Sequence, residues 1–273
     1  MIKNLTKYIH NIPKLPEIIV ELDSFRKSQN KNSKHLTMII KKDKNLHQDI
    51  LKVMDFNIFD FDTKPKNITN FIAFTNLEFV TTLATALTIT KSINLNLFSY
   101  AVTTDDFLYS NTLAMRITDI WINKIDKNLK NELLLPAFLQ GLSKPIISLA
   151  INENKLTEKF LNDISTSKSL ALIEEKFTGY KPGRITANIL KNWGLSYNII
   201  FPIAFSQDLI NCPKEFRLKA IILNIINNIC NLREPLSDKN IHIALEDLTL
   251  FDFDIELFLT SIDEIKNIIK KDY

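Results

Sequence analysis

Apolar residues recur at intervals of three and four along most of this chain of 273 residues. That spacing places them on one side of an α-helix. Ile18, Ile19, Leu22 and Phe25 form one such stripe. The strict alternation that is typical of strands is rare. The chain has only 4 glycines, which also favours helices, because tight hairpins usually need glycine at positive φ. The pattern therefore predicts an all-α protein.

Capping signals divide this pattern into separate helices. Short polar residues and prolines are preferred where a helix begins, and glycine where it ends. Residues 55–66 contain aromatics without a period and are expected to form a loop. Gly179 and Gly194 are expected to stop two helices, over residues 167–177 and 182–193. Further helices are expected to begin at Pro16-Glu17, Ser33, Asp43 or Asn45, Asn67, Asn76, Thr104, Ser196, Pro213 and Asp254.

The chain has no internal repeat and no Gly/Ser linker that would separate independent domains. We therefore expect two packed helical lobes and an extension. The N-terminal helical lobe covers residues 1–97, the second lobe covers residues 98–211, and a C-terminal helical extension covers residues 212–273.

Charge and cysteine content narrow the class of protein. The net charge of +3 is small, and the lysines are scattered, so nucleic-acid binding is not expected. Cys212 and Cys230 make neither a disulfide framework nor a metal quartet. The N-terminal residues lack the apolar core of a signal peptide, and no stretch of about 18 uncharged apolar residues suits a membrane span. We expect a cytoplasmic protein without membrane association.

Five segments in order along the chain carry a family resemblance, at residues 12–22, 44–56, 67–80, 137–147 and 179–195. IPKLPEIIVEL is similar to an opening Leu-Pro-x-Leu-Pro-x helix. AFLQGLSKPII follows the pattern Ala-hydrophobic-hydrophobic-His-Asp-hydrophobic-Gly-Lys, with Gln140 and Gly141 in the His and Asp places. Together, over residues 12–210, they resemble the HDOD family, the regulatory relatives of HD metal-dependent phosphohydrolases in bacterial signalling proteins. The resemblance implies an HD-domain-like multi-helix bundle.

The resemblance also locates the metal ligands of the parent hydrolases. They fall at Asn111, Gln140, Gly141, Pro182, Ser206 or Gln207, and Asn227. Divalent metals prefer imidazole nitrogen or carboxylate oxygen, so each of these residues is a poor ligand or none. The histidines of this chain, His10, His35, His47 and His242, lie elsewhere and share no metal-binding spacing. The resemblance therefore implies a module with no metal cofactor and no catalysis, which acts on a protein partner in a bacterial signalling pathway.

Six residues could remain from the parent cleft: Asn111, Gln140, Lys144, Arg184, Ser206 and Asn227. Lys144 and Arg184 could hold a phosphate-bearing small ligand or an acidic partner segment. Alternatively, the polar atoms of this set satisfy one another and the two cations stabilise helix ends.

Two rival functions stay open from the sequence. The first is a degenerate phosphohydrolase with residual nucleotide binding or activity, or with a relocated site. It would need converging carboxylates, but Glu174-Glu175, Asp105-Asp106 and Glu246-Asp247 are adjacent pairs, whose side chains point about 100° apart on a helix.

The second rival is an interaction module that presents aromatic side chains. A homodimer is one form that such a module could take. Phe59 and Phe61 in the 55–66 loop are the candidate partner surface, together with residues 251–258. The opposite interpretation is that these phenylalanines are buried as local plugs.

Overall fold

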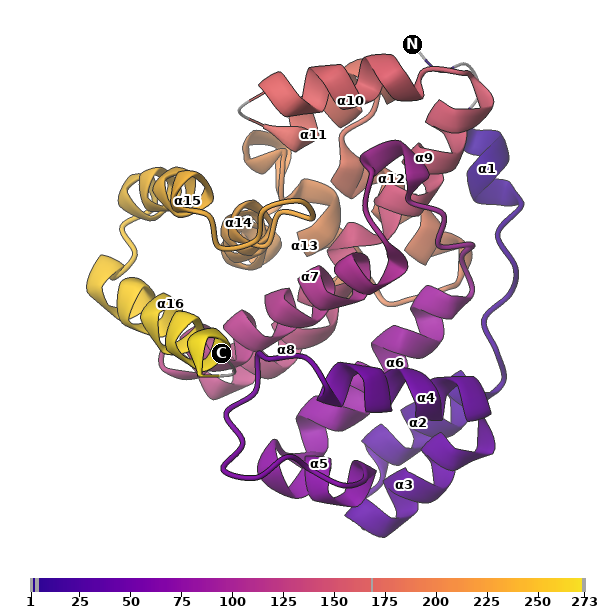
Figure 1. Cartoon of the computed structure of the whole chain (residues 1–273), viewed down its shortest axis with the longest axis vertical. Coiled ribbons are helices and arrows are strands. Elements are labelled where there is room, and N and C mark those ends of the chain that lie inside the picture. The colour runs from indigo at the N-terminus through magenta and orange to yellow at the C-terminus, as the bar shows by residue number, and fades with distance from the viewer. Residues whose placement is uncertain (1, 3–4, 168, 272–273) are drawn as a thin grey trace.

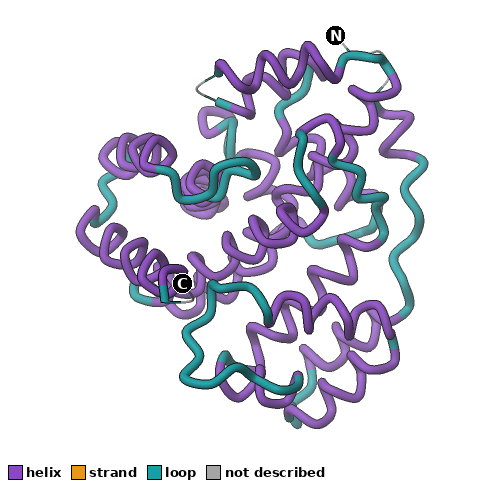
Figure 2. The backbone as a smooth tube through the Cα atoms, in the orientation of Figure 1, coloured by secondary structure: helices purple, strands orange, loops and turns teal. Residues whose placement is uncertain are grey.

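The computed structural model describes residue 2, residues 5–167 and residues 169–271. All regular elements in these ranges are helices, as Figure 2 shows. The all-α prediction is confirmed. Figure 1 shows α2 to α6 at one end of the molecule, α9 to α12 at the other, and α14 to α16 along one side.

The first group of helices consists of α2 (Ile18–Lys27), α3 (Ser33–Lys42), α4 (Lys44–Met54), α5 (Ile68–Phe74) and α6 (Leu77–Lys91). The side chains of Asp43, Asn67 and Asn76 accept hydrogen bonds from the first-turn amides, so these predicted helix starts are confirmed. At α3 the cap is Asn32, one residue before the predicted Ser33. Short oxygen-bearing side chains satisfy amides that the helix itself leaves unpaired.

The second group contains α7 (Thr104–Ile117), α8 (Lys127–Leu139), α9 (Ser143–Glu153), α10 (Thr157–Thr166), α11 (Leu170–Thr178), α12 (Pro182–Asn192) and α13 (Tyr197–Phe205). Shorter helical turns join them: η1 (Phe98–Tyr100), the π-helical turn η2 (Thr118–Ile122), η3 (Gln140–Leu142) and η4 (Leu209–Asn211). Gly179 and Gly194 have φ of 79° and 71°. Both predicted stops are therefore confirmed, since glycine adopts this conformation without a Cβ clash.

The last helices are α14 (Lys214–Ile229), α15 (Asp238–Leu250) and α16 (Ile255–Lys270). α14 packs against α13, α15 and α8, while α16 returns to η2 and α7. The Trp121 ring lies 5.0 Å from that of Phe258 and fixes this return. The extension is thus packed onto the second group of helices.

Helices α1 (Thr6–His10), α10 and α15 were not predicted. α1 has five residues and no side-chain cap, so it carries little local signal. It packs against α9 and α12 rather than against α2 to α6, and a linker leads from it to α2 at the far end of the molecule (Figure 1). The first group of helices therefore starts in space at α2. The three-part division by residue number stays a prediction.

One continuous hydrophobic core runs through both groups of helices. The segment 127–153 is long and apolar enough to cross a membrane by composition, but 89% of its most apolar window is buried inside the protein. That burial fits a core helix of a soluble protein.

The 55–66 loop contributes to this core. Phe59 is 6% exposed and its ring meets those of Phe71 and Phe79 edge to face. Phe61 stacks on Phe59 and is half-buried. The expectation of an exposed partner surface is therefore wrong for Phe59, because the loop uses its aromatics as a plug over α5 and α6.

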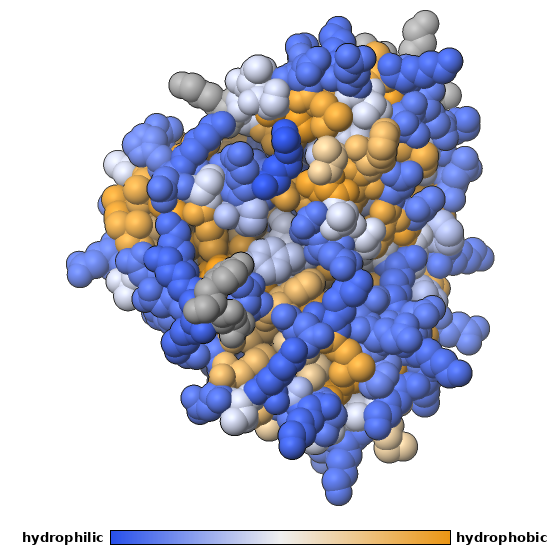
Figure 3. Space-filling view, in the orientation of Figure 1, coloured by the Kyte–Doolittle hydropathy of each residue, from blue (hydrophilic) through white to orange (hydrophobic). Residues whose placement is uncertain are grey.

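Hydrophilic side chains cover most of the face seen in Figure 3, with hydrophobic surface where α15 turns into α16. Leu250, at the end of α15, is 73% exposed, and Ile255 and Leu259 share one exposed side of α16. These three residues are called the α15–α16 surface below. Phe258, from the same predicted segment, is fully buried.

Candidate functional site

The side chain of Asn111, on α7, fills the space beside Gly141, on η3. Both are buried. A Cβ built on Gly141 would lie 2.5 Å from Asn111 Oδ1 and 3.3 Å from its Cγ. No real Cβ sits so close to an oxygen, so the amide of Asn111 fits only because residue 141 has no side chain. The two positions form one packed unit.

Several polar atoms around this unit are buried without a hydrogen-bond partner among the described residues. They are Asn111 Nδ2, both side-chain atoms of the Gln140 amide, and Ser143 Oγ. The alternative in which these polar atoms satisfy one another is therefore not what the structure shows at this point. Unpaired buried polar groups are costly. Asn111, Gln140 and Ser143 are called the polar patch below.

Backbone contacts fix the patch against α12. Thr186 Oγ1 donates to the carbonyl oxygen of Gln140 at 3.1 Å and accepts from the amide of Ser143 at 3.1 Å. Thr186 is fully buried. One hydroxyl thereby satisfies two backbone groups where η3 passes into α9, and it holds Gln140 in place.

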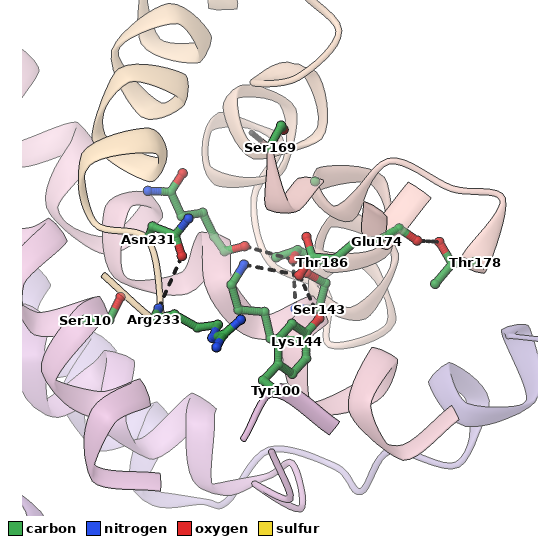
Figure 4. A network of polar contacts seen from close by, with 12 residues as sticks. Tyr100, Ser110, Ser143, Lys144, Ser169, Glu174, Thr178, Thr186, Asn231 and Arg233 are labelled. Carbon is green, nitrogen blue, oxygen red and sulfur yellow. Dashed lines mark hydrogen bonds and ion pairs between the residues drawn. The ribbon is translucent and has the colours of Figure 1, made fainter. Parts of the chain in front are cut away.

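A buried charged cluster lies one turn further along, on Lys144, Glu174 and Tyr100 (Figure 4). Lys144 Nζ is 3.6 Å from Glu174 Oε1, and the Tyr100 hydroxyl donates to the same oxygen at 2.6 Å. Glu174 is 1% exposed and Tyr100 is fully buried. Burial, then the charge of Glu174 and the hydrogen bond to it, raise the pKa of Tyr100 well above its ordinary value. The phenol therefore remains a hydrogen-bond donor.

Two members of this cluster, Tyr100 and Glu174, are absent from the predicted site residues. In the sequence Glu174 stands out only as one of an adjacent carboxylate pair, yet it lies in the middle of α11 and is buried. Tyr100 was not considered. A carboxylate on an otherwise apolar helix face was the one available signal, and its partners come from segments far away in the chain.

Lys144 and Asn227 line the same small cavity, of about 60 Å³. Most of the lining residues are polar. It includes Glu174 and Ser169 from α11 and its start, and Asn228, Asn231 and Asn240 from the extension. This volume suits a few water molecules or a small polar group. Two of the six predicted cleft residues therefore line one cavity, although Lys144 belongs to α9 and Asn227 to α14 in the C-terminal extension.

Arg184 and Ser206 do not line this cavity. Arg184 donates to Asp208 at 3.0 Å and its guanidinium lies 3.9 Å from the Phe205 ring centre. Ser206 Oγ donates to the carbonyl oxygen of Ile203 at 3.0 Å. Burial opposes ionisation of Asp208, but hydrogen bonds from Arg184 and its neighbours outweigh it and hold the pKa of Asp208 below its ordinary value. Both residues thus act in local packing and pairing.

The six predicted residues consequently lie in three places. Asn111 and Gln140 belong to the polar patch, and Lys144 and Asn227 to the small cavity. Arg184 and Ser206 lie where α12 meets the end of α13, where Arg184 pairs with Asp208 and Ser206 bonds to the Ile203 carbonyl. The structure does not bring them together as one open cleft.

A divalent metal of the kind that HD hydrolases hold does not fit the donors at the positions that the family resemblance assigns to its ligands. Asn111 and Gln140 offer amides, and the position of the Asp ligand has no room for a side chain. Carboxylate and imidazole donors are needed to bind such an ion tightly. Within the described residues, no group of three or more His, Cys, Asp or Glu side chains converges.

Comparison with known proteins places this geometry in a family. The HDOD domain model matches residues 12–209. No curated protein sequence shows a significant match. A virulence factor from Campylobacter jejuni subsp. jejuni is 20% identical, with a TM-score of 0.58, over 98% of this chain and 100% of that one.

Two further solved structures have the same fold. One, from Shewanella amazonensis SB2B and provisionally named a phosphohydrolase, is 15% identical with a TM-score of 0.66, over 97% of this chain and 94% of that one. The other, from Marinobacter aquaeolei VT8 and provisionally named a signal transduction protein, is 13% identical with a TM-score of 0.65, over 99% of this chain and 66% of that one. At these identities the likeness shows the HD-like helical fold.

Proposed function

This chain belongs to the HDOD family, and from that premise we propose that it is a non-catalytic signalling module. It regulates by binding a protein partner, or a small ligand, and not by hydrolysing a phosphoester. Membership of the family and the signalling name given to a structural neighbour support the regulatory part.

The packing of Asn111 against Gly141 carries the non-catalytic part. A metal-dependent hydrolase needs a bound ion to make hydroxide available near neutral pH. The resemblance assigns one metal ligand to residue 111 and another to residue 141. Here the Asn111 side chain fills the space that a side chain at residue 141 would need. A carboxylate at residue 141 would require Asn111 to move, so the loss is built into the packing.

Metal analysis and turnover test the proposal together. The purified protein is incubated with Mn²⁺, Mg²⁺ or Fe²⁺, desalted, and analysed for bound metal, and phosphodiester hydrolysis is measured in parallel. We expect no stoichiometric metal and no turnover. Stoichiometric metal with turnover that is lost in Gln140→Ala would overturn the proposal. Lys191→Gln, an exposed change on α12, is the matched control.

The α15–α16 surface is our candidate for the partner contact. Its three apolar residues are exposed and lie within or next to the predicted aromatic segment 251–258. Cross-linking from the native cell should recover the same protein with the wild type and with Ile210→Ser, a still more exposed change on η4. It should lose that protein with Leu250→Ser. Equal recovery with Leu250→Ser would exclude this surface.

The same cross-linking shows whether the partner is a second copy of the chain. A cytoplasmic location fits the proposal and is tested by fractionation.

A further inference from the structure

A second polar cavity, larger than the first, lies away from the polar patch, where three parts of the chain meet. Its volume is about 700 Å³. It is lined by the start of α6, by the end of α7 with η2 and the first half of α8, and by α16. A ligand in it would touch the first group of helices, the second group and the extension at once.

Cations outnumber acids by one in the lining of this cavity. Arg116, Lys124, Lys127 and Lys130 face three acids, Glu78, Asp119 and Glu264. Lys124 pairs with Glu264 at 2.9 Å. Lys127 is exposed and has no carboxylate partner within the described part of the chain. That leaves Arg116 and Lys130 at the inner end.

Arg116 and Lys130 share a single carboxylate. Asp119 Oδ2 is 2.9 Å from Arg116 Nη1, and Asp119 Oδ1 is 3.3 Å from Lys130 Nζ. The Lys130 side chain is only 6% exposed and that of Arg116 18% exposed. Arg116 Nε is buried and has no hydrogen-bond partner within the described residues. Two nearly buried cations on one anion leave a positive charge that is poorly solvated, which is costly without a counter-ion.

Backbone donors add to the positive potential. The Asn76 side chain accepts from the amide of Phe79, which leaves the amides of Leu77 and Glu78, both in the cavity lining, without an acceptor in the helix. The start of a helix of this length carries a partial positive charge. The wider π-helical turn η2, an irregularity often found at functional sites, places Asp119 between the two cations.

We propose that this cavity binds a phosphate-bearing small molecule. Arg116 and Lys130 hold the phosphate with their unmatched charge, the α6 amides donate to it, and Lys127 closes the outer side. Because the ligand touches both groups of helices and α16, binding would couple the extension to the rest of the fold. This inference does not depend on whether the protein is catalytic.

Inorganic phosphate and AMP serve as the two probes, each added in low salt. Chloride at the same ionic strength is the control. Thermal unfolding and titration calorimetry measure binding to the full chain. Phosphate should raise the melting temperature of the wild type, since a ligand that binds only the folded state stabilises it. Lys127→Gln, an exposed change, should weaken binding about fivefold. Lys191→Gln removes the same charge elsewhere and should leave binding unchanged.

Lys130→Met separates a binding role from a structural one. It removes the surplus charge but keeps the apolar stem, so the free protein should be at least as stable as the wild type, while phosphate no longer stabilises it. Tighter binding of AMP than of phosphate would identify a nucleotide as the source; equal binding would identify free phosphate. The proposal is overturned if neither probe binds, or if Lys130→Met and Lys191→Gln respond to phosphate alike. Such a failure would leave the metal and turnover results, and thus the proposed function, untouched.

Discussion

Replacing Gly141 by alanine tests whether residues 111 and 141 are one packed unit. The new Cβ would lie 2.5 Å from Asn111 Oδ1, so the buried amide must move by several tenths of an ångström. Overpacking of this kind costs about 1–3 kcal/mol. The backbone at Gly141 has no positive φ, so alanine also stabilises by about 0.4–1 kcal/mol through the unfolded chain. The net expectation is a loss of about 1–2 kcal/mol, or about 2–8 °C in melting temperature.

The background of the substitution decides the outcome. In Asn111→Ala the obstructing amide is absent, so Gly141→Ala should become neutral or stabilising. The coupling between the two changes is then about 1–3 kcal/mol, within the range for residues in contact. Urea unfolding of the four proteins of the cycle measures it.

Gly183→Ala is the matched control for this cycle. Its Cβ would run into the backbone carbonyl oxygen of Ile203, which truncating Asn111 cannot relieve, so it should destabilise equally in both backgrounds. If Gly141→Ala also destabilises both backgrounds equally, residues 111 and 141 do not compete for space, and the argument for a structurally filled ligand position fails.

Three further changes test the buried contacts. Phe59→Ala should lower the unfolding free energy by about 3–5 kcal/mol, as for a core aromatic; a loss below about 1 kcal/mol in urea unfolding would contradict its role as a plug. Lys144→Met should cost about 3–5 kcal/mol because Glu174 is left buried and unpaired, and adding Glu174→Gln should recover part of it; the double variant behaving additively would count against the pair. Asp208 has a lowered pKa in the folded state, so its contribution is present above its unfolded pKa of about 3.9 and is lost as the pH falls through the folded pKa. Arg184→Gln should raise that pKa in an NMR titration, and an unchanged value would show that Arg184 does not hold the carboxylate.

Local signals in the sequence were sufficient for the helices and for many of their ends. Asn67 caps the helix that it was predicted to cap, and Asp43 and Asn76 cap helices that were predicted to begin there. Gly179 and Gly194 end theirs. A cap acts within three or four residues, so it can be predicted without the fold. The short α1, without a cap, is the kind of element that this reasoning misses.

The candidate site depended on contacts between distant segments. Lys144 and Asn227, both predicted as cleft residues, share a cavity, whereas Arg184 and Ser206 make other contacts. Tyr100 and Glu174 are 74 positions apart, and only packing joins a phenol to a carboxylate over that separation.

The sequence by itself determined an all-α protein of the HDOD family, because periodicity, caps and motif residues are local properties. Only the tertiary structure decided that Asn111 fills the space beside Gly141, that Phe59 is a plug, and that Arg116 and Lys130 share one carboxylate. Burial and distance set the energy of a polar group, and both arise only when remote segments pack together.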